Sequence, residues 1–183
     1  MYTVNRQSGI SLIELIIFII IVSTAVAGVL SVMNITTQHS ADPMLRKQAQ
    51  AIAESLLEEI ELQPFTYCDP DDANATTATS AAGCATTPEL IGPEPGETRY
   101  TSPQFDNVND YAGFTMAGIN DITNTPIGGL SGYTASVAIT QAGTSLGLAD
   151  NTAALQIDVT VTAGNDSLTL TGYRFRYAPN AVP

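Results

Sequence analysis

The sequence predicts an α+β protein in which a long N-terminal helix packs on an antiparallel β-sheet. Three observations predict this fold: an apolar run near the N-terminus, an amphipathic segment directly after it, and alternating apolar and polar residues in the last third of the chain. We expect a membrane-spanning helix at residues 10–33, its amphipathic continuation at 34–63, and a globular, β-rich domain at 64–183.

The composition excludes several classes of function. Eighteen Asp and Glu residues against six Lys and Arg give a formal net charge of −12, which would repel a phosphate backbone, so nucleic acid is not an expected partner. The chain has one histidine and lacks a nucleophile-elbow motif, a phosphate-binding glycine loop and a His/Cys cluster. We therefore expect a protein that is not an enzyme, with no catalytic residue and no cofactor.

The first element is the apolar run at residues 10–33, whose roughly 24 residues would form a helix of about 36 Å, long enough to cross a bilayer. Its single charged residue is Glu14, and a carboxylate within a span is costly unless it has a partner. Arg6 precedes the run and would orient it with the following residues on the periplasmic side. A cleaved signal peptide and a plain anchor whose Glu14 reaches the lipid headgroups are the alternatives.

Residues 9–14, G-I-S-L-I-E, resemble the class III signal of type IV prepilins and type II secretion pseudopilins. The resemblance implies a type IV pilin-like fold with a leader at residues 1–9. It also implies cleavage after Gly9 by the prepilin peptidase, which then methylates the new N-terminal residue, Ile10. It also implies that Glu14 pairs with the N-terminal amine of a neighbouring subunit during assembly. In a medium of low dielectric, such a pair would relieve the cost of burying the carboxylate.

Three later stretches, G-P-E-P-G-E-T-R, F-D-N-V-N-D-Y-A-G-F and L-T-G-Y-R-F-R-Y, resemble minor pilins of the mannose-sensitive haemagglutinin (MSHA) type IV pilus. The resemblance implies a minor pilin that contributes to pilus assembly. It would be held in the bacterial inner membrane with a periplasmic domain, and later enter the pilus. The implied partners are other minor pilins and the major pilin, with an assembly platform and its ATPase acting indirectly. A minor pseudopilin of a type II secretion system and an adhesive pilin at the pilus tip remain alternatives.

The second element is an amphipathic helix. Asp42 and Pro43 are typical of a helix start, and Pro64 predicts its end. Either one helix is kinked at Pro43 or two helices meet there, and the sequence favours a boundary. His39, at this junction, is expected to be an exposed linker residue and not a ligand. The apolar face comprises Leu45, Ala49, Ile52, Ala53, Leu56 and Ile60.

Cys68 and Cys84 follow the helix. An even number of cysteines in an exported chain favours a disulfide over a metal site, which would need further His or Cys ligands. The segment between them is rich in Ala, Thr and Asp, so we expect the disulfide to close a flexible surface loop.

Residues 88–129 are rich in Pro, Gly, Asn and Asp, which predicts turns joining short strands. Four residues there carry side-chain oxygens that calcium prefers, but their spacing is not that of an EF-hand loop and such residues commonly form turns. We therefore expect a structural turn and no metal, with calcium as the alternative. The four residues are Asp106, Asn107, Asn109 and Asp110.

The last third contains three expected strands, 133–140, 154–163 and 167–177, in which apolar and polar residues alternate. A Gly-Asn turn within A-G-N-D predicts a hairpin between the last two. Arg174 and Arg176 alternate with aromatic residues, and we expect them on the outer face of the terminal strand, offsetting the acidic surface, in preference to a stacking platform for a polymer. The residues expected to face the helix are Tyr133, Ala135, Val137, Ile139, Leu155, Ile157, Val159, Val161, Leu168 and Leu170.

Overall fold

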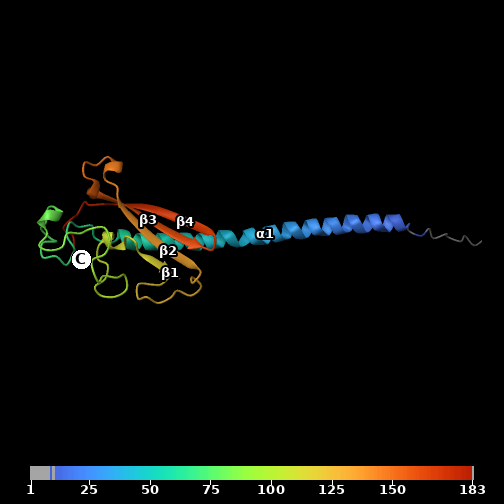
Figure 1. The fold of residues 1–183 in the computed structure, drawn as a ribbon, viewed down its shortest axis with the longest axis horizontal. Helices are drawn as coiled ribbons and strands as arrows, with labels where there is room; N and C mark the ends of the chain where they lie inside the picture. The colour runs from blue at the N-terminus through green and yellow to red at the C-terminus, as the bar shows by residue number, and fades with distance from the viewer. Residues whose placement is uncertain (1–8, 10, 183) are drawn as a thin grey trace, which may run out of the picture. The chain divides into compact units, whose positions relative to one another are not determined.

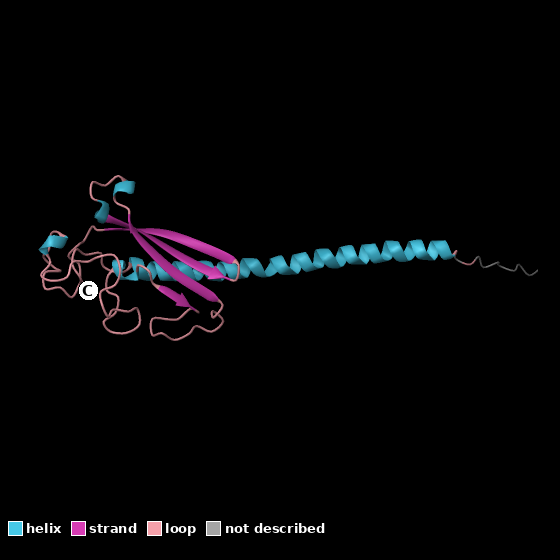
Figure 2. Ribbon diagram, viewed as in Figure 1, coloured by secondary structure: helices cyan, strands magenta, loops and turns pink. Residues whose placement is uncertain are grey.

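A computed structural model describes residue 9 and residues 11–182, with the side chains of all of these except residues 35–42. The chain divides after Met44 into two compact units, and the second unit contains the β-sheet and the hydrophobic core. Figures 1 and 2 show the elements of both.

The helix α1 (Leu12–Glu61) contains 50 residues, with Pro43 inside it. The expected boundary at Pro43 is therefore wrong. A proline inside a helix removes one backbone hydrogen bond and costs about 3 kcal/mol, a loss that the many other bonds of a long helix can absorb. The helix ends three residues before Pro64, as expected, because a residue preceding proline disfavours the helical conformation. The side chains of His39 and Asp42 lie outside the described residues.

The sheet has four antiparallel strands in the order of the sequence, β1 (Thr115–Ala117), β2 (Tyr133–Gln141), β3 (Ala154–Ala163) and β4 (Asp166–Phe175). Figure 2 shows them side by side in this order. The expected ranges of the last three strands are confirmed to within two residues at each end. The expectation of several short strands in residues 88–129 is wrong, since β1 is the one strand there within the described residues.

A two-residue turn joins β3 to β4, as the A-G-N-D sequence predicts. Ala163 pairs with Asp166, and Gly164 between them has φ 61°. A positive φ at this position suits glycine, which lacks the Cβ that would clash there. The hairpin therefore sets the register of the last two strands.

The core lies between the second half of α1 and one face of the sheet. The expected apolar faces of β2 and β3 are fully buried, and Leu168 and Leu170 of β4 pack against them. On α1 the expected face is buried from Ala49 to Ile60, whereas Leu45 is 38% exposed. Leu45 precedes Ala49, the first helix residue of the core cluster, by one turn. An α+β architecture with the helix packed on an antiparallel sheet is thus confirmed.

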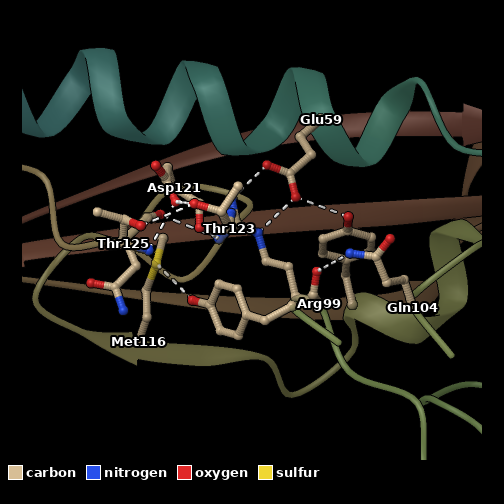
Figure 3. A network of polar contacts seen from close by, with 10 residues as sticks. Glu59, Arg99, Gln104, Met116, Asp121, Thr123 and Thr125 are labelled. Carbon is tan, nitrogen blue, oxygen red and sulfur yellow. Dashed lines mark hydrogen bonds and ion pairs between the residues drawn. The ribbon is translucent and has the colours of Figure 1, made fainter. Parts of the chain in front are cut away.

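The long segment between α1 and β2 is held to the helix by Arg99. Figure 3 shows its side chain reaching toward Glu59 on α1. The Arg99 guanidinium also donates to the backbone oxygens of Asn120 and Asp121 at 3.3 and 3.4 Å. One buried side chain therefore joins the helix to two parts of a segment that has little regular structure.

Candidate functional site

The N-terminal part of α1 is apolar and exposed. Residues 12–34 have a mean hydropathy of 2.8 and none of their most apolar window is buried. By length and composition this helix can cross a membrane, either as a span or as a signal sequence. Membrane association is therefore supported by this helix alone.

The polar side chains of residues 12–34 differ in whether they have hydrogen-bond partners. Ser23 and Thr24 donate hydrogen bonds to backbone oxygens of the preceding turn, at 2.6 and 2.9 Å for Ile19 and Ile20. Such bonds remove the cost of placing a hydroxyl in lipid. The carboxylate of Glu14, in the first turn, has no hydrogen bond or ion pair with the side chain or backbone of any other described residue. Glu14 is the only charged residue of positions 12–34, so its carboxylate is the group there whose burial in lipid would cost most.

Gly9 precedes the helix and is exposed, and nothing within 4 Å would meet a side chain placed there. Ile10, the expected methylated residue, lies outside the described residues. Gly9 lies three residues before the start of α1 at Leu12, and Glu14 is in the first turn of that helix.

The expected disulfide joins Cys68 to Cys84, with an S–S distance of 2.04 Å. The intervening loop has more internal structure than expected. Both carboxylate oxygens of Asp72 accept backbone hydrogen bonds, from Asn74 and Ala85 at 2.8 and 2.9 Å and from Thr86 and Thr87 at 2.7 and 2.9 Å. These donors hold the pKa of Asp72 well below its usual range.

The four calcium candidates separate into two groups. Asp106 and Asp110 lie among other carboxylates, whereas the Asn107 amide donates to Thr66 Oγ1 at 2.6 Å. Asn109 Oδ1 is buried without a hydrogen-bond partner. The turn that was expected here is present, as a short 3-10 helix at Val108–Tyr111.

Sequence analysis did not identify the other carboxylates of this acidic cluster. The carboxylates form three groups of three residues, and within each group one oxygen per residue lies within 4.8 Å of the others. Besides Asp106 and Asp110, the groups contain two aspartates that follow α1 and three glutamates that precede Gln104. The glutamates lie in a proline-rich segment, and their spacing in the sequence does not indicate that they approach Asp110. The approach depends on tertiary contacts, such as the hydrogen bond from Gly92 N to Asn109 O at 3.1 Å. The members are Asp69, Asp71, Glu89, Glu94, Glu97, Asp106 and Asp110.

The two arginines near the end of β4 do not lie on its outer face. The Arg176 guanidinium lies 4.1 Å from the ring centre of Phe65, and Arg174 donates to Gln63 O at 3.0 Å. Both arginines are half-buried, and the aromatic residues that alternate with them are exposed. The expectation was wrong because alternate residues of a strand point to opposite faces and the arginines find cation–π and carbonyl partners on the inner one.

Comparison of the chain with protein-family models, with curated proteins and with solved structures gave no match. The features available for a functional proposal are therefore those of the chain itself. They are the exposed apolar helix with Glu14, the disulfide-closed loop and the partly buried acidic cluster.

Proposed function

We propose that the chain is a minor pilin of an MSHA-like type IV pilus and is cleaved after Gly9 by a prepilin peptidase. The observation that carries the proposal is Glu14, a lone carboxylate in the first turn of an exposed apolar helix that begins just after Gly9. An ordinary membrane anchor gains nothing from a carboxylate at this depth.

Cleavage after Gly9 creates an N-terminal amine on Ile10, four residues before Glu14 in the sequence. In a filament the apolar helices leave the membrane and pack against one another. The Glu14 carboxylate of an incoming subunit then pairs with the amine of a neighbour, which offsets the burial of both charges. Breaking a buried ion pair costs about 3 to 5 kcal/mol, so a subunit displaced along the filament axis is disfavoured.

The rest of the chain supports the same proposal. The apolar helix holds the subunit in the inner membrane before assembly, and the disulfide suits a domain in the oxidising periplasm. The domain would contact other minor pilins and the major pilin. The platform and the assembly ATPase would act on the membrane-held subunit.

The test is to express the full chain in a piliated host with and without its prepilin peptidase. Intact mass and N-terminal sequencing should show cleavage after Gly9 and a methylated Ile10, both dependent on the peptidase. The Glu14→Ala variant should still be cleaved but be depleted from sheared pili. Glu58→Ala, an exposed position of the same helix outside the span, should enter pili normally.

Three results would overturn the proposal. An uncut chain would indicate an ordinary anchor. Cleavage beyond Met33 would indicate a secretory signal. Equal incorporation of Glu14→Ala and the unmodified chain would show that Glu14 makes no pairing contact in the filament.

A further inference from the structure

The acidic cluster contains carboxylate oxygens that are buried and have no hydrogen-bond donor. Glu89 is 7% exposed and Asp110 is 0% exposed. Neither oxygen of Glu89 has a hydrogen-bond partner, and the same holds for Asp110 Oδ1. Glu94 is half-buried beside them, and one oxygen from each of the three residues lies within 4.8 Å of the others. Buried polar groups in folded proteins almost always have a partner, so this arrangement needs an explanation.

The backbone holds these carboxylates together. Glu89 N donates to Tyr67 O at 2.9 Å, and Gly92 N donates to Asn109 O at 3.1 Å. Asp110 Oδ2 accepts from Asp106 N and Asn107 N at 2.9 and 2.7 Å. These bonds fix one oxygen of Asp110, and the other, Oδ1, is buried without a hydrogen-bond partner.

No arginine or lysine of the described residues forms an ion pair with these three carboxylates. Arg176 lines a cavity with Glu89 and attracts it, but its Nη1 donates to Thr152 Oγ1 at 3.2 Å and its guanidinium lies over aromatic rings. Arg176 attracts Glu89 without forming an ion pair with it, so the charges that the three carboxylates can carry are not fully compensated within the described residues.

Bound protons would compensate them only in part. Glu94 and Asp110 are close enough to share a proton. A protonated Glu89, however, would keep a buried hydroxyl without an acceptor and a carbonyl oxygen without a donor. A divalent cation would contact all three carboxylates at once and leave none of these oxygens without a partner.

We propose that Glu89, Glu94 and Asp110 bind one calcium ion. All three offer oxygen ligands, which favours a hard cation, and both cysteines are occupied by the disulfide. Calcium accepts irregular and bidentate carboxylate coordination, whereas magnesium prefers a regular octahedron and retains its waters. The ion would join the segment at 89–94 to the 3-10 helix that carries Asp110. This inference does not depend on the chain being a pilin.

The full chain in detergent micelles, freed of metal with a chelator, tests the proposal with calcium chloride as the probe. Titration calorimetry should show one saturable site. Calcium at about 100 times Kd should raise the midpoint of thermal unfolding by roughly 5 to 10 °C. The combined Glu89→Gln and Asp110→Asn variant should lose both effects. Asp166→Asn, an exposed aspartate in the β3–β4 hairpin, should keep both.

A second measurement keeps the test decisive if the double variant fails to fold. Glu89→Gln alone removes a buried carboxyl group whose charged form is unfavourable at this site. It should raise the unfolding midpoint of the calcium-free protein while weakening calcium binding by at least about tenfold. No saturable binding in the unmodified chain would overturn the proposal, as would equal binding by Glu89→Gln and Asp166→Asn. An equal response to magnesium chloride, or to sodium chloride at the same ionic strength, would also overturn it.

Discussion

Arg99 donates one hydrogen bond to each carboxylate oxygen of Glu59, from Nε and from Nη2, both at 2.7 Å. The Arg99 side chain is 5% exposed and that of Glu59 24% exposed. Tyr111 adds a third donor to Glu59, at 2.9 Å. Burial alone would lower the pKa of Arg99, but the hydrogen bonds and charge of Glu59 raise it, so the guanidinium stays charged.

Replacing this arginine should destabilise the domain. Arg99→Gln would leave the Glu59 carboxylate without its charged partner and should lower the free energy of unfolding by about 2 to 4 kcal/mol. Arg46→Gln removes the same charge at an exposed position of α1 and should change it by no more than about 0.5 kcal/mol. Urea unfolding in detergent, followed by circular dichroism, measures both. Similar effects of the two variants would show that the pair contributes nothing beyond its charge.

The disulfide should contribute measurably to stability. Cys68 and Cys84 are separated by 16 positions, and closing a loop of that length stabilises the folded state by about 3 kcal/mol in the chain-entropy description. Reductant should therefore lower the urea midpoint of the unmodified chain. A variant with both cysteines changed to serine should match the reduced protein and be insensitive to reductant. A midpoint that reductant does not move would contradict this expectation.

Asp72 should make stability depend on acid pH. Because its pKa is depressed in the folded state, its contribution is present above the unfolded pKa of about 3.9 and is lost as the pH falls toward the folded value. Asp72→Asn should be less stable than the unmodified chain at pH 7, and the difference should shrink below about pH 4. Thermal unfolding at a series of pH values measures this difference, with Asp166→Asn as the exposed control. A difference that is constant with pH would exclude titration of Asp72 as its cause.

Gly143 is expected to tolerate no side chain. A Cβ built there would overlap Asp150 O and lie 2.9 Å from Asn151 Cα, and both atoms belong to the backbone. Gly143→Ala must therefore shift the β2–β3 connection and should cost about 1 to 3 kcal/mol. Gly128→Ala meets no atom within 4 Å and should be close to neutral. Equal thermal midpoints for the two variants would show that this connection adjusts without cost.

The features that sequence analysis predicted correctly are those encoded by neighbouring residues. The alternation in β3 determines which side chains face the helix, and Pro64 alone predicts where α1 ends. Pro43 was harder to interpret, because the same residue that starts one helix can lie inside another when the flanking residues favour the helix on both sides. The local sequence pattern therefore did not determine whether Pro43 begins a helix or lies inside one.

The acidic cluster could not have been assembled from the sequence. Glu89 and Asp110 approach each other because turns at Gly92 and Val108 bond to partners far along the chain, and no local spacing encodes those partners. The inward orientation of Arg176 depends in the same way on Phe65 and Tyr67. Local pattern identifies which residues alternate along a strand, but tertiary contacts decide which of the two faces is covered.

The order of elements along the chain also affects how the protein is made. The helix face from Ala49 to Ile60 is synthesised well before the strands from Tyr133 to Phe175 that cover it. While the intervening segment is being produced, this apolar face has no sheet to pack on and is open to contact with other chains. Native packing must therefore wait for the last third of the chain, and a truncated product that stops before β3 would remain prone to aggregation.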